Sequence, residues 1–245
     1  MVYQTGGEQG AAMIFRQLFE PQSSAYTYLL GCPETRQAAL IDPVLETADR
    51  DLELLGELGL SLTHTVETHI HADHVTGAAR LRSLTGCKAA LPARSGATRA
   101  DVQLEEGTPL RIGHIQLHPL YTPGHTDDHH SYFVEASGSG RVFTGDALLI
   151  DGCGRTDFQN GNAATLYQSV HDKLFSLAAE TLVYPAHDYQ QRRVSSIGQE
   201  RDRNPRLGGG KSEEEFVAIM AALNLPRPKK MDLAVPANRS CGEGN

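Results

Sequence analysis

The chain is 245 residues long, 40% of them hydrophobic and 21% charged, a composition typical of a globular enzyme. No apolar run approaches the roughly 20 residues needed to span a bilayer, so no membrane association is expected. The formal net charge of −8 argues against nucleic acid as a partner, because affinity for a phosphate backbone comes mainly from Lys and Arg side chains.

The first third of the chain alternates short apolar runs with turn residues, a pattern typical of strands. The three runs before residue 42 are expected to pair as antiparallel strands, and the leucines that follow recur at helical spacing up to Gly59. The elements expected here are strands over residues 13–19, 25–31 and 37–41, a helix over 47–58, a strand over 62–68 and a helix over 74–84.

The second half again places strands before helices. Asn162 is the expected N-cap of a helix with an apolar stripe, and Ser212 with Glu215 predicts a capping box that opens the last helix. Pro226 and Pro228 predict an extended tail after that helix. The elements expected here are strands over residues 114–121, 131–135, 141–143 and 181–184 and helices over 162–177 and 212–223.

The repeated order of strands and then a helix predicts an α/β protein with two packed sheets and helices outside, an αββα sandwich. No shift in composition marks a second domain. We therefore expect a single domain over residues 1–245, with a core over about 13–223 and an extended C-terminal tail over 224–245.

Four of the predicted strands run directly into short segments that carry histidine or aspartate. In chain order these side chains are His69, His71, Asp73 and His74, then His125, then Asp146, and finally His187. Alternation along the first strand places His69 and His71 on one side. Imidazoles together with carboxylates suit zinc, iron and manganese, whereas calcium takes oxygen ligands throughout. The set therefore predicts a transition-metal site.

In order and spacing, these motifs resemble the metallo-β-lactamase superfamily over about residues 13–241, and within it the sequence is similar to the persulfide dioxygenase family. The segments that carry the resemblance are 68–77, 143–150, 153–159, 184–189, 224–226 and 234–238. The first segment defines only the superfamily, whereas Cys-Gly-Arg-Thr-Asp-Phe at 153–158 and the two late segments are more particular to the dioxygenases. The resemblance implies the metallo-β-lactamase fold.

The resemblance also implies how the seven groups are used. Hydrolases of this fold can hold two metal ions with all seven, whereas persulfide dioxygenases hold one Fe(II) per chain with three, which correspond here to His69, His125 and Asp146. Two histidines and one carboxylate form the facial triad of non-haem Fe(II) oxygenases, with positions left for water, the substrate sulfur and O₂. The remaining groups would fix the ligand tautomers and tune the iron. These are His71, Asp73, His74 and His187.

By the same resemblance, the reaction is the oxidation of glutathione persulfide with O₂ and water to sulfite and glutathione. Arg155 is a candidate to pair with a glutathione carboxylate, and the alternative is a structural salt bridge to Asp157. Tyr189 either donates its hydroxyl to the substrate or packs beside His187. The resemblance favours a homodimer and allows a separate rhodanese-like sulfurtransferase to act upstream.

The sequence departs from the family just after His125. Residues 126–131 include two acids and two histidines, where many relatives carry small residues. Asp127 and Asp128 would repel a carboxylate-bearing substrate if they pointed into the site. We expect a solvated turn instead, and the alternative is an effect on metal preference or access.

The main alternative function is a glutathione thioester hydrolase of the glyoxalase II type, which shares the fold, the ligands and a glutathione-containing substrate but uses a metal-bridged hydroxide. Such hydrolases usually carry a longer helical C-terminal region, and residues 156–159 favour the dioxygenase. One iron per chain, rather than two zinc or mixed metals, would separate the two. A non-catalytic metal-dependent binding module is a further alternative, which O₂ consumption would exclude.

The four cysteines lie far apart without a Cys-x-x-Cys pair, which fits neither a thiolate zinc site nor a disulfide scaffold, so free thiols are expected. The first residues lack a charged region followed by an apolar stretch, so no secretory signal is expected. A cytoplasmic location is the resulting prediction.

Overall fold

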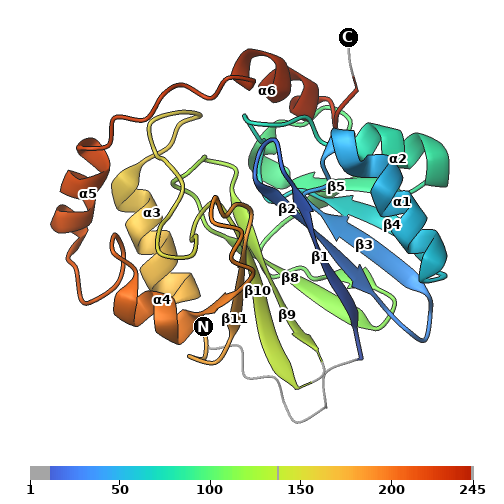
Figure 1. Ribbon diagram of the computed structural model, residues 1–245, viewed down its shortest axis with the longest axis horizontal. Helices are drawn as coiled ribbons and strands as arrows, with labels where there is room; N and C mark the ends of the chain where they lie inside the picture. Colours follow the sequence, from blue (N-terminus) through green and yellow to red (C-terminus); the bar gives the residue numbers. More distant parts are fainter. Residues whose placement is uncertain (1–11, 137, 244–245) are drawn as a thin grey trace.

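Two six-stranded β-sheets face each other at the centre of the computed structural model, which describes residues 12–136 and 138–243 (Figure 1). The first sheet contains β1 (Ile14–Glu20), β2 (Ala25–Gly31), β3 (Gln37–Ile41), β4 (Ser61–Val66), β5 (Lys88–Pro92) and β6 (Val102–Leu104), paired in this order. As expected, β1, β2 and β3 are antiparallel. From β3 to β6 the strands run parallel, because a helix or a long loop separates each pair along the chain.

The second sheet contains β7 (Leu110–Ile112), β8 (Ile115–Tyr121), β9 (His130–Ala136), β10 (Ser139–Gly145), β11 (Leu182–Pro185) and β12 (Ser195–Ser196). Strands β7 to β10 form an antiparallel meander. Strand β11 then joins β10 in parallel, and β12 pairs with β11 at the edge.

Helices cover the outer face of each sheet, and the last helix covers one end of the sandwich (Figure 1). They are α1 (Ala48–Glu57), α2 (Ala78–Thr85), α3 (Ala163–Ser169), α4 (Ile197–Arg203), α5 (Glu213–Ala221) and α6 (Met231–Arg239), with 3₁₀ turns at Leu45–Thr47 and Ala93–Ser95. Leu55 of α1 and Leu81 of α2 pack on the first sheet. Leu166 of α3, Ile197 of α4 and Phe216 of α5 pack on the second sheet. The predicted αββα sandwich is confirmed.

A group of aromatic side chains fills the core between the sheets. The ring centroid of Tyr28 on β2 lies 5.0 Å from that of Phe143 on β10 and 5.6 Å from that of Tyr184 on β11. The Tyr28 hydroxyl donates a hydrogen bond to the carbonyl oxygen of Pro185 at 2.5 Å. Buried aromatic rings contribute large apolar areas, so this core holds the end of β11 firmly against the first sheet.

The expected extended C-terminal tail is wrong over Met231–Arg239, which forms α6. Pro226 and Pro228 do keep the preceding linker out of any helix or strand, because proline cannot donate a backbone hydrogen bond. Pro236 nevertheless lies inside α6. Packing contacts outweigh its unfavourable helix propensity, since one face of α6, including Asn238, is buried against the rest of the molecule.

Two predicted helices have different limits from those expected. The helix expected over residues 74–84 begins at Ala78, because the residues before it form an irregular loop. Asn162 caps α3 as predicted, with its side chain accepting from the Thr165 amide, but the helix continues as a π-helical turn over Val170–Leu174. The capping box formed by Ser212 at the start of α5 is confirmed.

Within the described residues, no helix is both long and apolar enough to cross a membrane. The prediction of free thiols is confirmed, and all four are buried. They are Cys32, Cys87, Cys153 and Cys241.

Candidate metal centre

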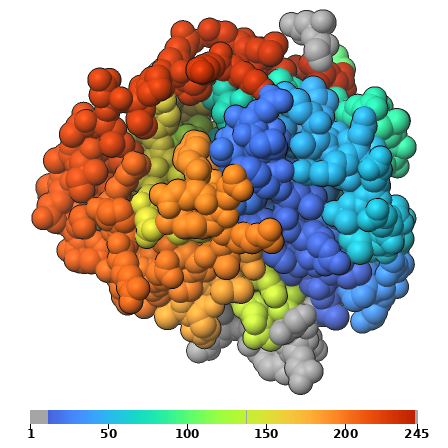
Figure 2. All heavy atoms as spheres, in the orientation of Figure 1, coloured from blue at the N-terminus to red at the C-terminus, as the bar shows by residue number. Residues whose placement is uncertain are grey.

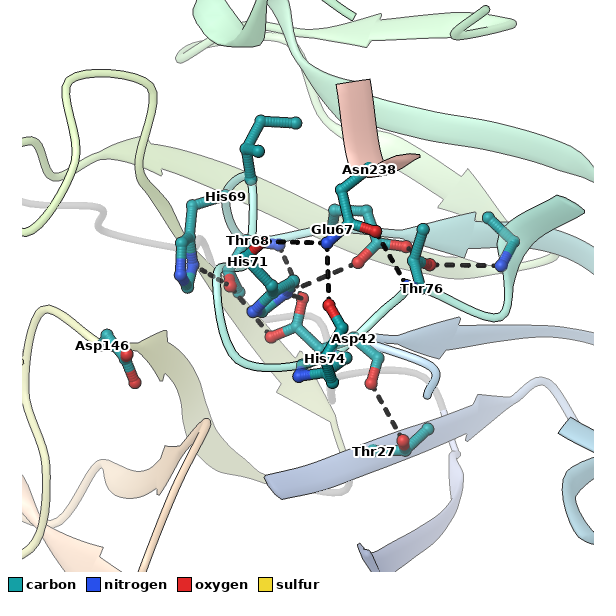
Figure 3. Close-up of polar contacts among 12 residues, drawn as sticks. Thr27, Asp42, Glu67, Thr68, His69, His71, His74, Thr76, Asp146 and Asn238 are labelled. Atoms are coloured by element: carbon teal, nitrogen blue, oxygen red, sulfur yellow. Dashed lines mark hydrogen bonds and ion pairs between the residues drawn. The ribbon is translucent and has the colours of Figure 1, made fainter. Parts of the chain in front are cut away.

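The loops that follow β4, β8 and β10 bring three predicted ligands together. One ligating atom of each of His69, His125 and Asp146 lies within 4.8 Å of the other two. His125 Nε2 is 3.4 Å from Asp146 Oδ2, and all three side chains are largely shielded from solvent. Figure 3 shows His69 on the side of its loop that faces Asp146. The fold therefore assembles two imidazoles and one carboxylate at a single point.

Hydrogen bonds to the Nδ1 atoms of both histidines leave their Nε2 atoms free. His125 Nδ1 donates to the carbonyl oxygen of Arg155 at 2.7 Å. The Thr68 hydroxyl donates to Asp42 Oδ2 and can therefore accept from His69 Nδ1, which lies 2.9 Å away. A neutral imidazole that is protonated on Nδ1 presents its Nε2 lone pair, which is the form that binds a metal ion.

The surroundings of His69 and His71 shift the pKa values of the two imidazoles in opposite directions. Burial lowers the pKa of His69 well below its usual range, and the imidazoles of His71 and His125 add to this effect. Burial alone would also lower the pKa of His71. However, His71 Nε2 lies 3.1 Å from Asp42 Oδ1 and 3.5 Å from Glu67 Oε2, and these carboxylates hold its pKa well above the usual range.

The other predicted groups lie beside the three-residue cluster. Ligating atoms of His71, Asp73 and His74 also lie within 4.8 Å of one another, and His74 Nδ1 is 3.0 Å from Asp73 Oδ2. His187 stands between the two clusters, with Nε2 at 3.5 Å from Asp73 Oδ2 and 3.9 Å from Asp146 Oδ1. All seven predicted groups therefore meet at one site.

Gly124 fixes the position of the loop that carries His125. Its φ angle is +130°, which L side chains rarely adopt, and a Cβ atom at this position would lie 2.3 Å from the backbone nitrogen of Leu166. The Gly124 carbonyl also accepts a hydrogen bond from the Asn162 amide, 2.8 Å away. The loop therefore packs directly against the start of α3, which a larger residue would prevent.

Three buried polar atoms of the site are suited to contact a cation. Asp146 Oδ1, His71 Nδ1 and His74 Nε2 are buried and have no hydrogen-bond partner. Buried polar atoms in proteins almost always have a partner, and imidazole nitrogens and carboxylate oxygens are the donors that transition metals prefer. The residues present therefore fit a metal cofactor.

Comparison with known proteins identifies the family. The model of the metallo-beta-lactamase superfamily matches residues 21–187. Human persulfide dioxygenase ETHE1 is 53% identical over 237 residues, which cover 96% of this chain and 91% of the human protein. The chain belongs to the persulfide dioxygenase family of the metallo-β-lactamase superfamily. The crystal structure of ETHE1 from Myxococcus xanthus, 57% identical, covers 94% of this chain and 100% of its own with a TM-score of 0.90.

Hydroxyacylglutathione hydrolases are more distant than the persulfide dioxygenases. The hydrolase from Methylococcus capsulatus is 37% identical over 168 residues, which cover 68% of this chain and 63% of that protein. The similarity to the hydrolase thus spans a smaller part of both chains, which favours the dioxygenase branch.

The prediction of a cytoplasmic location is wrong, because the human, mouse and bovine persulfide dioxygenases are named as mitochondrial proteins. That prediction depended on the lack of a secretory signal and of a membrane span. Neither feature separates the cytoplasm from a mitochondrial compartment, since mitochondrial targeting uses amphipathic segments of a different composition.

Arg155, the residue considered for substrate binding in this persulfide dioxygenase homologue, already has several partners. Its Nε and Nη2 atoms donate to the two Asp157 carboxylate oxygens at 2.6 and 2.7 Å, so the alternative salt bridge is present. Its Nη atoms also donate to the carbonyl oxygens of Pro226 at 2.7 Å and Leu225 at 3.3 Å. A guanidinium has five N–H donors, so one on Nη1 is left.

Tyr189 lies beside His187 with its ring nearly parallel, and the ring centroids are 6.2 Å apart. Its side chain is nonetheless 77% exposed. The segment that carries it packs against the β1–β2 hairpin, since the Tyr26 hydroxyl donates to the Arg192 carbonyl oxygen at 2.9 Å. Figure 2 shows this orange segment beside the blue hairpin. Tyr189 therefore stands at the rim of the site.

The segment after His125 is not the solvated turn that we expected. Asp127 is exposed, but Asp128 is buried and its Oδ2 accepts from the Ile70 amide at 2.9 Å. His129 is buried as well, and its Nε2 accepts from the Asp146 amide at 3.0 Å. Asp128 and His129 thus support the loops that carry His69 and Asp146.

Sequence reasoning missed three residues outside the seven predicted groups that contact and support the site. They are Asp42, Glu67 and Asn238. Asn238 belongs to a segment that carries the family resemblance, but its sequence position gives no indication of a role. Glu67 is next to the first motif, and a buried acid at a strand end was the signal that could have found it.

Proposed function

We propose that the protein is an iron-dependent persulfide dioxygenase. It converts glutathione persulfide, O₂ and water into glutathione and sulfite, which balances all atoms. The observation that carries the proposal is the cluster of His69, His125 and Asp146 in a chain 53% identical to a persulfide dioxygenase over 96% of its length. Two histidines and one carboxylate are the donor set of non-haem Fe(II) oxygenases.

One Fe(II) per chain, held by His69, His125 and Asp146, supplies the redox chemistry that side chains cannot provide. The protein holds the ligands ready for it. The hydrogen bonds at Nδ1 orient both imidazole rings so that Nε2 is the atom available to the metal, and the His129 ring fixes the backbone of Asp146. Preorganised ligands of this kind lower the cost of binding the metal.

The remaining predicted groups shape the electrostatics around the iron. His71, Asp73, His74 and His187 lie next to the ligands, with the Asp73 carboxylate in contact with the imidazoles of His74 and His187. Burial raises the pKa of Asp73, but His74 and His187 outweigh it and hold that pKa well below its usual range. Asp73 therefore remains an anion that orients His187 beside Asp146.

Arg155 and Tyr189 bind the glutathione part of the substrate in this proposal. Tyr189 has an exposed hydroxyl above His187 that donates to a glutathione carbonyl or carboxylate. Arg155 offers a single remaining N–H, so a bidentate contact with a substrate carboxylate requires exchange of Asp157. Removal of either side chain should raise KM more than it lowers kcat.

The test is O₂ consumption by anaerobically purified, iron-loaded protein when glutathione persulfide is added, with metal content measured on the same sample. Uptake of O₂, formation of sulfite and about one iron per chain would support the proposal. If protein that holds about one iron per chain consumed no O₂ after glutathione persulfide was added, the proposal would be refuted.

The glyoxalase II-type hydrolase is the second candidate, and one observation favours it. His71 Nδ1 and His74 Nε2 are buried without partners beside Asp73, which is an arrangement that could hold a second metal ion. Two metal ions per chain together with cleavage of a glutathione thioester would establish the hydrolase.

A further inference from the structure

The C-terminal helix α6 lies over the loop between β4 and α2, which we call the ligand loop (residues 67–77). The exposed linker from α5 to α6 is irregular, with a single turn just before α6. It crosses the top of the molecule in Figure 1. Ala234, Asn238 and Cys241 are buried on the side of α6 and its following turn that meets the body of the protein. Figure 3 shows Asn238 reaching from α6 into the ligand loop.

Among the residues that the structure describes, the carboxamide of Asn238 hydrogen-bonds only to the backbone of the ligand loop. Its Nδ2 atom donates to the carbonyl oxygens of His71 and His74, each at 2.9 Å. Its Oδ1 atom accepts from the Thr76 amide, also at 2.9 Å. The side chain is 2% exposed, so solvent cannot replace these bonds without opening the interface. An unpaired buried donor or acceptor would cost about 1–3 kcal/mol.

Two buried carboxylates also hold the ligand loop, one from Asp42 after β3 and one from Glu67 at the start of the loop itself. The Thr76 hydroxyl donates to Glu67 Oε1 at 2.5 Å. Asp42 Oδ1 accepts from the Thr68 amide at 2.7 Å and contacts His71 Nε2 at 3.1 Å. The loop is therefore held by an internal contact to Glu67, by Asp42 from the segment after β3, and by Asn238 from α6.

The placement of α6 depends on contacts beyond Asn238. The Thr98 amide donates to the Arg239 carbonyl oxygen at 2.9 Å, and Glu243 forms ion pairs with Arg82 and Arg99. A Cβ atom on Gly242 would lie 2.5 Å from the Thr76 carbonyl oxygen. The backbone after α6 thus lies directly against the end of the ligand loop.

We propose that Asn238 is a positioning residue for the metal centre. By holding the backbone of His71, His74 and Thr76, it fixes the conformation of the ligand loop and so the orientation of the imidazoles at the site. The inference rests on the metal site of the proposed function, but not on the reaction that the metal performs. Metal affinity therefore depends on a helix residue that lies 162 to 167 residues further along the chain.

The test uses Asn238→Asp, which replaces the two N–H donors by an oxygen that repels the His71 and His74 carbonyls. Asn224→Asp is the matched control, because it makes the same chemical change at an exposed position in the linker. Both variants are made in the full chain and freed of metal. Co(II) is then titrated, and its absorption bands report both affinity and ligand geometry.

We expect the Co(II) dissociation constant of Asn238→Asp to rise about 10-fold, the lower end of the effect of removing an outer partner of a metal ligand, because the lost bonds hold the loop that carries His69 and not a ligand itself. Its Co(II) spectrum should change, and that of Asn224→Asp should match the unaltered protein. The proposal would be overturned if Asn238→Asp bound Co(II) with the same affinity and spectrum as the control and only lowered the melting temperature of the metal-free protein. That result would indicate a structural role alone.

Asn238→Ala provides the second measurement if Asn238→Asp does not fold. Hydrogen exchange of the metal-free variant, followed by mass spectrometry, should be faster for the ligand loop and unchanged for β9 and β10. Unchanged exchange in the ligand loop would contradict the proposal. Neither measurement depends on persulfide oxidation, so a failure of the proposed reaction would remain distinguishable from a failure of this inference.

Discussion

Asp42→Asn tests whether a buried carboxylate holds the predicted site together. Asp42 is 2% exposed and follows β3. Its Oδ1 accepts from the Thr68 amide at 2.7 Å and contacts His71 Nε2 at 3.1 Å, while Oδ2 accepts from the Thr68 hydroxyl at 2.9 Å. Asparagine has almost the same shape, so the substitution removes the charge and one of the two acceptor oxygens with little change in packing.

The expected loss of stability is about 3 kcal/mol. A hydrogen bond to a charged group contributes about 1.5–3 kcal/mol and one between neutral groups about 0.5–1.5 kcal/mol, so three weakened bonds lose about 1 kcal/mol each. Breaking a buried ion pair costs a similar amount, about 3–5 kcal/mol. The φ angle of Asp42 is +48°, which Asn tolerates as well as Asp, so no backbone strain is added.

Thermal unfolding of the metal-free protein measures this loss without a contribution from bound metal. For a chain of this length, about 3 kcal/mol corresponds to a fall of about 6–12 °C in Tm. Asp49→Asn is the control, because the Asp49 side chain is 72% exposed in its 2.9 Å pair with Arg80 and should lose no more than about 1 kcal/mol. Equal Tm values for the two variants would refute the reasoning.

Three further predictions concern the loops and the cap around the site. Asp146→Ala should lose both iron and O₂ uptake, whereas His187→Ala should keep most of its iron in metal analysis, and an empty site in the latter would contradict the three-ligand scheme. Gly124→Ala should lower the free energy of unfolding in urea by about 3 kcal/mol, because its Cβ would overlap the α3 backbone. Gly96→Ala is the control: its Cβ would have free space, so only about 1–2 kcal/mol should be lost, to left-handed backbone strain. Asn162→Ala removes the N-cap of α3 and should lower the free energy of unfolding by about 1 kcal/mol in the same assay. An unchanged urea midpoint would show that the cap is dispensable.

The elements that the sequence predicts are those whose pattern is local. Strands β2 and β3 agree residue for residue with the prediction, because turn residues bound each apolar run. Strand β5 and helix α4 were not predicted. Lys88–Pro92 contains two alanines, which are uncommon in strands, and Ile197–Arg203 is only seven residues long and mostly polar. Tertiary contacts determine both.

The same distinction applies to the candidate site. The seven imidazoles and carboxylates can be listed from the sequence because each follows a strand, and strand ends meet at one end of a sandwich. Asp42 and Asn238 could not be assigned in this way. They lie 29 and 167 residues from His71 along the chain, and only the fold shows that both touch the segment that contains it.

A ligand motif defines which atoms can bind a metal, but not the conformation of the loop that presents them. The ligand loop has no helix or strand to satisfy its backbone, so its buried N–H and C=O groups need partners from other parts of the chain. Asp128 and Asn238 supply such partners for Ile70, His71 and His74. A change at these supporting positions would therefore alter how the same imidazoles are oriented without any change in the motif itself.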